Sequence, residues 1–268
     1  VTDALGCQSV DSTTISVYPT LTANAGTDTT VCAGSPFNLG GTPTATGGSG
    51  SGYTYLWSPT VGVSNINAAN PTGVATATTT YAVTVTDANG CQASLAATVG
   101  TPTAIDVIVD ATQVSCNNAN NGAVTVRVSG GVGPYSFAWS NGANTEDLNN
   151  VGPNTYYVTV TDFKGCTIRD TAVITQPAPL TGTVVGTNVT CFGGTNGAAN
   201  LTVAGGTAPY TFVWSPFANT EDLTNIGAGS YNVIITDTKG CQTVAGVVIT
   251  QPAQIVLTAA VTNVNCNG

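Results

Sequence analysis

The sequence of 268 residues contains no histidine and no methionine, and only four of its residues are basic. Charged residues make up 6% of the chain, against about 25% in typical globular proteins. With a net charge of −9, the chain lacks the basic surface that releases phosphate counterions, which excludes nucleic acid as a partner. No apolar stretch is long enough to cross a bilayer, so membrane insertion of this segment is not expected.

The same absences exclude most catalytic chemistry. Without histidine, no nucleophile and general base can be paired. The paired acids Glu146-Asp147 and Glu221-Asp222 do not suit a glycosidase, because neighbouring residues on a strand point to opposite faces. We interpret them as solvated acidic turns, with calcium or a polar partner as the alternative. The sequence therefore predicts no enzyme and no cofactor.

What the chain has instead is a repeat with a period of 75 residues. Pro-Tyr-x-Phe-x-Trp at 134–139 returns at 209–214, and Asn-Thr-Glu-Asp-Leu at 144–148 returns at 219–223. A looser copy lies upstream, around 53–57. A fixed period is typical of arrays that stack one structural unit along a line. Such an array favours reach, spacing or adhesion over catalysis at a single site.

Prolines recur near the borders of the repeats, where they end strands and stiffen short linkers. They are Pro19, Pro102, Pro177 and Pro252. The predicted modules therefore cover residues 19–101, 102–176 and 177–251. Residues 1–18 are expected to be the last strand of a preceding module, and residues 252–268 the first strand of a following one. The chain is thus expected to be a window on a longer array.

Within a module the apolar residues alternate with a period of two, which indicates strands. Tyr135, Phe137 and Trp139 share one face of a strand, as do Tyr156, Val158 and Val160. Seven or so short strands with an early tryptophan are typical of an immunoglobulin-like sandwich. The tyrosines that open one strand fit the tyrosine corner of strand F; they are Tyr81, Tyr156 and Tyr231. The predicted fold is all-β, with tandem immunoglobulin-like β-sandwich modules arranged as a rod.

The eight cysteines are periodic as well, at two per module. With no histidine nearby and no CxxC pair, they indicate disulfides in an oxidising compartment rather than a zinc site. Buried free thiols are the other reading. The cysteines expected in disulfides are Cys32, Cys91, Cys116, Cys166, Cys191 and Cys241.

Two pairing schemes are open. The simpler one closes a bridge inside each module: Cys32–Cys91, Cys116–Cys166 and Cys191–Cys241. It meets a geometric objection, because the A–B and F–G turns lie at opposite ends of such a sandwich and a disulfide spans only about 4–7 Å between Cα atoms. The alternative joins the A–B turn of one module to the F–G turn of the next, as Cys32–Cys166 and Cys116–Cys241. Simplicity slightly favours the first scheme.

Two other recurring residue types have structural and functional readings. The aspartate of Thr-Asp-x-x-Gly-Cys could bind calcium, but a single local carboxylate favours a turn in which it accepts backbone N–H groups. These aspartates are Asp3, Asp87, Asp162 and Asp237. The tryptophans Trp57, Trp139 and Trp214 could stack on sugars, but their strand periodicity favours core packing.

Several motifs together resemble the SprB repeat of giant surface adhesins in gliding bacteria of the Bacteroidota. The chain carries Cys-x-x-x-x-x-Gly-Ala, Gly-Gly-x-x-Pro-Tyr-x-Phe-x-Trp-Ser, Thr-Glu-Asp-Leu, Thr-Asp-x-x-Gly-Cys and Thr-Gln-Pro. The resemblance covers 116–176 and 191–251. Residues 19–101, with a longer insertion at 41–52, are more similar to a PKD-like module of the same secreted proteins.

The resemblance implies type IX secretion, display on the cell surface and a role in adhesion or gliding. The expected partners are neighbouring modules, surface polysaccharide or other copies of the chain. A carbohydrate- or calcium-binding module, or an accessory domain of a secreted polysaccharide-degrading enzyme, is the alternative function. The resemblance also implies O-glycosylation at Ser12, Thr29 and Thr171, in Asp-Ser/Thr motifs that Asp237-Thr238-Lys239 does not match.

Overall fold

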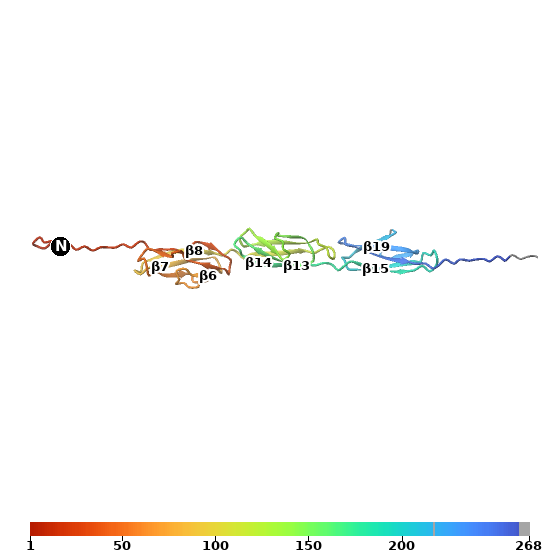
Figure 1. Ribbon diagram of the computed structural model, residues 1–268, viewed down its shortest axis with the longest axis horizontal. Coiled ribbons are helices and arrows are strands. Elements are labelled where there is room, and N and C mark those ends of the chain that lie inside the picture. Colours follow the sequence, from red (N-terminus) through yellow and green to blue (C-terminus); the bar gives the residue numbers. More distant parts are fainter. Residues whose placement is uncertain (217, 263–268) are drawn as a thin grey trace, which may run out of the picture. The chain divides into compact units, whose positions relative to one another are not determined.

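The computed structural model describes residues 1–216 and 218–262, and every regular element in them is a β-strand (Figure 1). Position 266, which carries a cysteine, and the end of the expected following strand lie outside the described residues. Each sandwich below is named by its place in the chain: first for β1–β8, second for β9–β14 and third for β15–β20.

The third sandwich shows the architecture most plainly. One sheet has the strand order β15-β16-β18 and the other has β17-β19-β20, all antiparallel. Lettered A, B, C, E, F and G in chain order, these are an A-B-E sheet facing a C-F-G sheet, the immunoglobulin arrangement without strand D. The strands are β15 (Thr181–Thr187), β16 (Gly197–Ala204), β17 (Tyr210–Ser215), β18 (Leu223–Ile226), β19 (Gly229–Asp237) and β20 (Gln242–Ile249).

The core of the third sandwich follows from the two-residue alternation of its strands. On β19, Val233 and Ile235 are fully buried while Ile234 between them is exposed. Trp214 on β17 is buried in the same cluster, together with Leu201. Its indole Nε1 donates to the Thr220 carbonyl oxygen at 2.9 Å, so the buried polar atom is satisfied.

The second sandwich repeats this order, with sheets β12-β10-β9 and β11-β13-β14. Its strand C carries the buried Trp139, whose Nε1 donates to the Thr145 carbonyl oxygen. The strands are β9 (Asp106–Thr112), β10 (Gly122–Ser129), β11 (Ser136–Trp139), β12 (Leu148–Val151), β13 (Asn154–Thr161) and β14 (Thr167–Ile174).

The first sandwich departs from the other two. Its main sheet has the order β2-β8-β7-β5, in which β2 runs parallel to β8, and two small sheets pair β1 with β4 and β3 with β6. Trp57 is again fully buried. The strands are β1 (Thr22–Ala23), β2 (Thr29–Thr30), β3 (Pro36–Asn38), β4 (Ala45–Thr46), β5 (Thr54–Ser58), β6 (Thr72–Val74), β7 (Thr79–Thr86) and β8 (Gln92–Gly100).

The tandem immunoglobulin-like fold is therefore confirmed, with one difference in strand number. Six strands, not seven, make up the second and third sandwiches, because the segment between strands C and E forms a turn fastened to the tryptophan. Residues 1–18 hold no strand beyond an isolated bridge between Thr2 and Gln8, and residues 252–262 hold none.

Contacts divide the chain into two compact units whose border passes through the second sandwich. One unit contains Val1–Val107, Val128–Phe137 and Thr159–Arg169; the other contains Ile108–Arg127, Ala138–Val158 and the chain from Asp170 onward. Both cysteines of each disulfide described below fall within a single unit.

The tyrosine corner is confirmed in two of the three sandwiches. The Tyr156 hydroxyl donates to the Gly152 carbonyl oxygen at 2.9 Å, and the Tyr231 hydroxyl donates to that of Gly227 at 3.0 Å. Each bond reaches four residues back and pins the E–F corner to strand F. In the first sandwich the Tyr81 hydroxyl donates instead to Val61, twenty residues upstream.

Replacing Tyr156 with phenylalanine tests the corner. The ring stays in the core, but the buried Gly152 carbonyl loses its donor, so we expect the free energy of unfolding to fall by about 1 kcal/mol. Tyr157→Phe is the matched control, because Tyr157 is the next residue on β13 and its side chain is 55% exposed. Denaturant unfolding followed by tryptophan fluorescence measures both; equal losses would contradict the corner's role.

Candidate functional site

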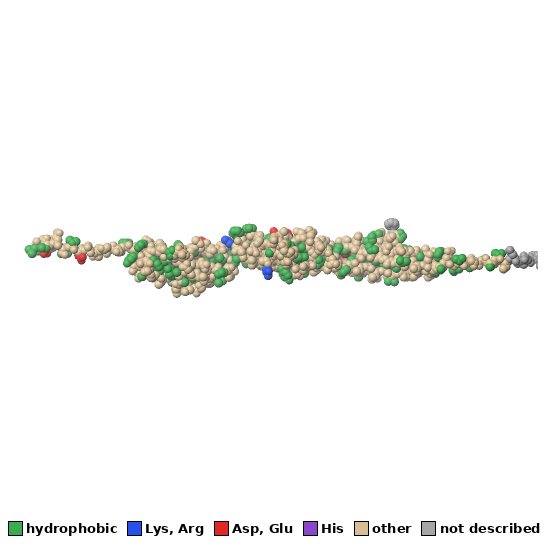
Figure 2. All heavy atoms as spheres, viewed as in Figure 1, with side chains coloured by type: hydrophobic (Ala, Val, Ile, Leu, Met, Phe, Trp, Pro, Cys, Tyr) green, Lys and Arg blue, Asp and Glu red, His purple; other side chains and the backbone are tan. Residues whose placement is uncertain are grey.

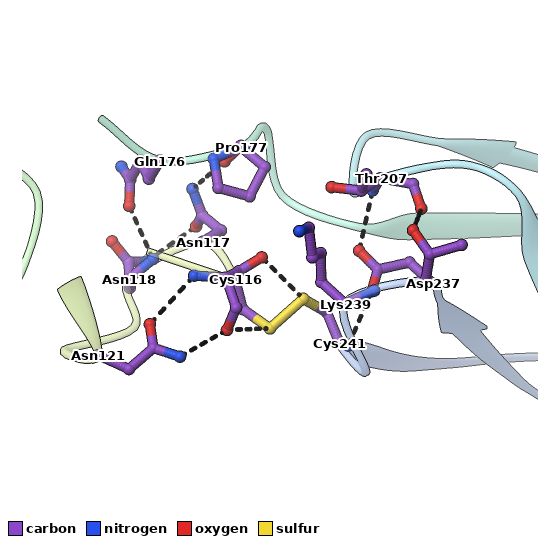
Figure 3. Close-up of a disulfide and its surroundings, with 12 residues drawn as sticks. Cys116, Asn117, Asn118, Asn121, Gln176, Pro177, Thr207, Asp237, Lys239 and Cys241 are labelled. Atoms are coloured by element: carbon purple, nitrogen blue, oxygen red, sulfur yellow. Dashed lines mark hydrogen bonds between the residues drawn. A yellow bond between two sulfur atoms is a disulfide. The ribbon is translucent and has the colours of Figure 1, made fainter. Parts of the chain in front are cut away.

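The feature that links the sandwiches chemically is a pair of disulfides. Cys32 is bonded to Cys166 with a Cα–Cα distance of 5.4 Å, and Cys116 to Cys241 with 5.7 Å (Figure 3). In the second bond, the loop between strands A and B of the second sandwich meets the F–G turn of the third. We call each such bond, with the loop and turn that carry it, a clamp.

These bonds correct the intramodule pairing that simplicity favoured. Cys116 follows β9 and precedes β10, whereas Cys166 lies between β13 and β14. Strands A to G alternate in direction, so the A–B and F–G turns of one sandwich lie at opposite ends, beyond the reach of a disulfide. Cys91 and Cys191, also expected in disulfides, are free and exposed in the structure.

The F–G turn of each clamp is built around the aspartate of Thr-Asp-x-x-Gly-Cys. In the third sandwich, Asp237 Oδ1 accepts hydrogen bonds from the backbone N–H groups of Lys239 and Cys241, both at 2.9 Å. Its Oδ2 accepts the N–H of Thr207, in the B–C loop, at 2.8 Å (Figure 3). One carboxylate thus fixes the turn internally, ties it to a second loop and holds the backbone of the cysteine.

The same arrangement recurs in the other sandwiches. Asp162 accepts from Lys164, Cys166 and Val132. Asp87 accepts from Asn89, Cys91 and Ser49. Asp3 accepts from Leu5 and Cys7, which indicates that the N-terminal residues form a turn of the same kind. The turn interpretation of these aspartates is confirmed, because their oxygens are taken up by backbone N–H groups.

The environment of these carboxylates favours the charged form. For Asp237, burial opposes the charge, but backbone hydrogen bonds from Cys241, Thr207, Lys239 and Gly240 outweigh it and lower its pKa. Burial and the equivalent backbone bonds act in the same way at Asp87 and Asp162, and the pKa of each is lowered. The turns are therefore held most firmly when the carboxylates are ionised.

A glycine pair lets the carboxylate approach the B–C loop so closely. Gly206 has a φ of +61°, and a Cβ atom there would lie 2.9 Å from Asp237 Oδ2. A side chain at this position would therefore displace the carboxylate from the Thr207 N–H. The Gly-Gly step of the repeat is thus part of the same device as the aspartate.

The A–B loop is held by side-chain amides. Asn121 Oδ1 accepts the Ser115 N–H at 3.0 Å, and its Nδ2 donates to the Ser115 hydroxyl oxygen at 2.7 Å. Gln176 Oε1 accepts the Asn118 N–H at 2.7 Å. Sequence reasoning missed these two residues, although Thr-Gln-Pro and the Asn before Gly-Ala recur in each copy of the repeat.

Contacts across the clamp add to the covalent bond. Asn117 Nδ2 donates to the Pro177 carbonyl oxygen at 3.0 Å, between the loop and the linker that leads to the third sandwich. Cys241 Sγ lies 3.4 Å from the Ser115 carbonyl oxygen (Figure 3). The four bonded cysteines are half-buried, whereas the free ones are exposed.

The other candidate residues have structural roles. All three tryptophans lie in the core, so the sugar-stacking hypothesis for them is wrong. The acid pairs are not simply solvated: Asp147 Oδ1 accepts the Val126 N–H, and Asp222 Oδ1 accepts the Leu201 N–H at 2.8 Å. Each aspartate thereby extends the pairing of strand B with strand E beyond the end of the backbone ladder, while Glu146 and Glu221 face solvent.

The expected glycosylation residues differ in their exposure. Ser12 and Thr171 are exposed, the latter on β14, and Thr29 on β2 is half-buried. Thr238, which departs from the motif, donates its hydroxyl to the Thr207 carbonyl oxygen at 2.9 Å.

Charged side chains are few and scattered on the face shown in Figure 2. Among the residues described, no group of His, Cys, Asp and Glu side chains is placed to hold a metal ion. Nor does that part of the chain contain a helix suited to crossing a membrane.

Comparison with known families and structures places these observations. The SprB repeat matches residues 108–144 and 183–219, in the second and third sandwiches. The chain therefore carries SprB repeats within tandem immunoglobulin-like modules, which is a non-catalytic type of domain. A search of curated proteins finds no match. The SprB repeats and the disulfides together indicate an extracellular protein.

Solved structures similar to this chain are tandem immunoglobulin domains. The N-terminal eight Ig domains of Down Syndrome Cell Adhesion Molecule share 13% identity at a TM-score of 0.49, covering 87% of this chain and 36% of that one. Sidekick-1 immunoglobulin domains 1–5 share 13% identity at a TM-score of 0.35, covering 90% of this chain and 60% of that one. This chain thus spans less than two thirds of either structure.

Acid titration tests the carboxylate of the F–G turn. Because the folded-state pKa of Asp237 lies below its ordinary value of 3.8, its contribution to stability is present above that pH and is lost as the pH falls through the lowered pKa. Asp237→Asn cannot ionise, so we expect lower stability at neutral pH and a weaker dependence of the unfolding midpoint on pH below 3.8. Asp106→Asn, at an exposed position, is the control. An unchanged acid dependence in Asp237→Asn would contradict the assignment.

Proposed function

We propose that this chain is part of the non-enzymatic repeat shaft of a large secreted cell-surface adhesin, giving reach and display for adhesion or gliding. The observation that carries the proposal is the clamp, which joins a sandwich to its neighbour in the chain. The match to the SprB repeat supports the same assignment. The proposed modules are 19–101, 102–176 and 177–251, with linkers between β8 and β9 and between β14 and β15.

The clamp suits a load-bearing shaft for a mechanical reason. Successive sandwiches are joined twice, once through the linker at Pro177 and once through the Cys116–Cys241 bond. The bond returns from the third sandwich to a loop 125 residues earlier in the chain. A short proline-containing linker has little freedom, and a second covalent attachment removes much of what remains. The proposed arrangement is therefore a semi-rigid rod.

The alternative functions receive less support from the repeated positions. A ligand-binding surface common to the repeats would carry the same exposed aromatics in each copy. Tyr157 and Phe163 are exposed in the second sandwich, but the positions 75 residues later hold Asn232 and Thr238. Carbohydrate or calcium binding by each repeat, or service as an accessory domain of a polysaccharide-degrading enzyme, is thus not favoured.

A surface location and a shaft role predict distinct results in the native cell. Antibody fragments raised against residues 19–251 should label intact cells without permeabilisation. Deletion of 102–251 from the native gene, which removes two whole modules, should keep the remaining protein on the surface but reduce attachment or gliding. Cell adhesion and motility assays measure this. Labelling that requires permeabilised cells would overturn the proposed location, and unchanged attachment and gliding would overturn the role.

We also propose O-glycosylation at Ser12, Thr29 and Thr171, with Thr238 left bare. A bulky hydrophilic group on β14 at Thr171 would block lateral pairing of this edge strand, in a protein with few charges to keep it soluble. Peptide mass spectrometry of material from the native cell should find added mass on these residues but not on Thr238. A mass equal to the bare polypeptide would remove the idea.

A further inference from the structure

Two exposed thiols are left at positions where the repeat elsewhere makes a disulfide. Cys191 lies 75 residues after Cys116, in the A–B loop of the third sandwich. Cys91 lies 75 residues before Cys166, in the F–G turn of the first sandwich. Cys116 and Cys166 are both bonded, each to a cysteine of the complementary kind. The chain therefore presents one unused A–B cysteine and one unused F–G cysteine.

The loop around Cys191 has the same internal bonds as the loop around Cys116. Asn196 Oδ1 accepts the Thr190 N–H, and its Nδ2 donates to the Thr190 hydroxyl oxygen. Gln251 Oε1 accepts the Gly193 N–H at 2.9 Å, as Gln176 does from Asn118. The loop is thus built in the bonded geometry although Cys191 has no partner.

The turn around Cys91 is also built in the bonded geometry. Asp87 Oδ1 accepts the N–H groups of Asn89 and Cys91 at 2.9 Å, and its Oδ2 accepts that of Ser49 at 2.8 Å. These are the contacts that Asp162 and Asp237 make beside the bonded Cys166 and Cys241.

An apolar groove next to Cys191 indicates what it binds. Phe192, Pro252 and Ile255 line it, and Ile255 is 86% exposed. The cleft beside the Cys32–Cys166 bond is lined at the equivalent places by Pro102 and Ile105, and Ile105 is only 9% exposed. The third equivalent residue, Leu180, packs against the core of the sandwich that follows its linker. At two of three linkers this apolar residue is therefore covered, and at Ile255 it is not.

We propose that the groove at Cys191 is the seat for the Thr-Asp-x-x-Gly-Cys turn of a further sandwich of this type, and that a Cys191 disulfide closes it. The Cys91 turn is the complementary half, which fits a groove of the Cys191 kind. A clamp would then connect every sandwich to the next with the same offset pairing. The inference rests on the clamp geometry and stands whether or not the chain serves adhesion.

The bond forms by thiol–disulfide exchange with a small-molecule disulfide as oxidant. The Cys191 thiolate attacks one sulfur of oxidised glutathione, which gives a mixed disulfide and releases one glutathione thiolate. The Cys91 thiolate of another copy then attacks the Cys191 sulfur and releases the second glutathione. Two protein thiols are oxidised to one disulfide, and one glutathione disulfide is reduced to two thiols.

A second copy of the chain serves as the probe. Full-length chain carrying Cys7→Ser and Cys266→Ser is mixed as nitrogen-isotope-labelled and unlabelled copies in a glutathione redox buffer. We expect a ladder of multimers on a non-reducing gel. Peptide mapping should find Cys91 of one copy bonded to Cys191 of another in excess over random pairing, with Cys32–Cys166 and Cys116–Cys241 intact in each copy.

Two controls make the result decisive. The same mixture in denaturant gives the random distribution of Cys91–Cys191, Cys91–Cys91 and Cys191–Cys191 bonds, against which the native mixture is compared. Adding Cys191→Ser should reduce the ladder to Cys91-linked dimers. Equal distributions in native and denaturing buffer, or glutathione adducts alone, would overturn the proposal.

Discussion

Each clamp depends on a carboxylate that accepts three backbone N–H groups. Asp237 holds the N–H of Cys241 and of Lys239 with one oxygen and that of Thr207 with the other. Backbone groups cannot rotate away as side chains do, so the carboxylate defines where the cysteine backbone lies. A disulfide forms only between Cα atoms within a narrow range of distance. The aspartate therefore links the folding of a sandwich to its bonding with the neighbouring sandwich.

This carboxylate also explains how a chain so poor in charge keeps three buried aspartates. Burying an ionised carboxylate is unfavourable unless hydrogen bonds replace the lost water. Asp87, Asp162 and Asp237 are each only 5% exposed and each has such bonds. Because charge-assisted bonds to backbone N–H groups are stronger than neutral ones, the turns remain rigid without a metal ion or a basic partner.

The sequence predicted the fold because its signals are local. Alternation along Tyr231, Val233 and Ile235 placed these residues inward, and the tyrosine that opens strand F forms its corner at Tyr156 and Tyr231. The short strands β1 to β4 carried no such signal, since the segment is rich in glycine and threonine and its pairings are brief. Tyr81 shows the same limit, because its partner Val61 lies in a segment without a counterpart in the other sandwiches.

The site was less accessible because its partners are distant in the chain. Periodicity located each cysteine in its turn, and strand direction raised the objection to intramodule bonds, but simplicity was given more weight than geometry. The amide bonds of Asn121 and Gln176 and the bond from Thr207 to Asp237 join residues that only the folded loops bring together. The local part of each turn, in contrast, was readable from Thr-Asp-x-x-Gly-Cys alone.

The offset pairing has a consequence that a bridge within each sandwich would not have. An intramodule disulfide would stabilise one core and leave the linker as the single connection to the next sandwich. With Cys116 bonded to Cys241, the core of the third sandwich is held by its own packing around Trp214, and the bond acts at the joint instead. Stability within a sandwich and connection between sandwiches are thereby assigned to different interactions. The sequence of a core can then vary between repeats, as it does between the first sandwich and the other two, provided that the aspartate, the glycine and the cysteine of the turn are kept.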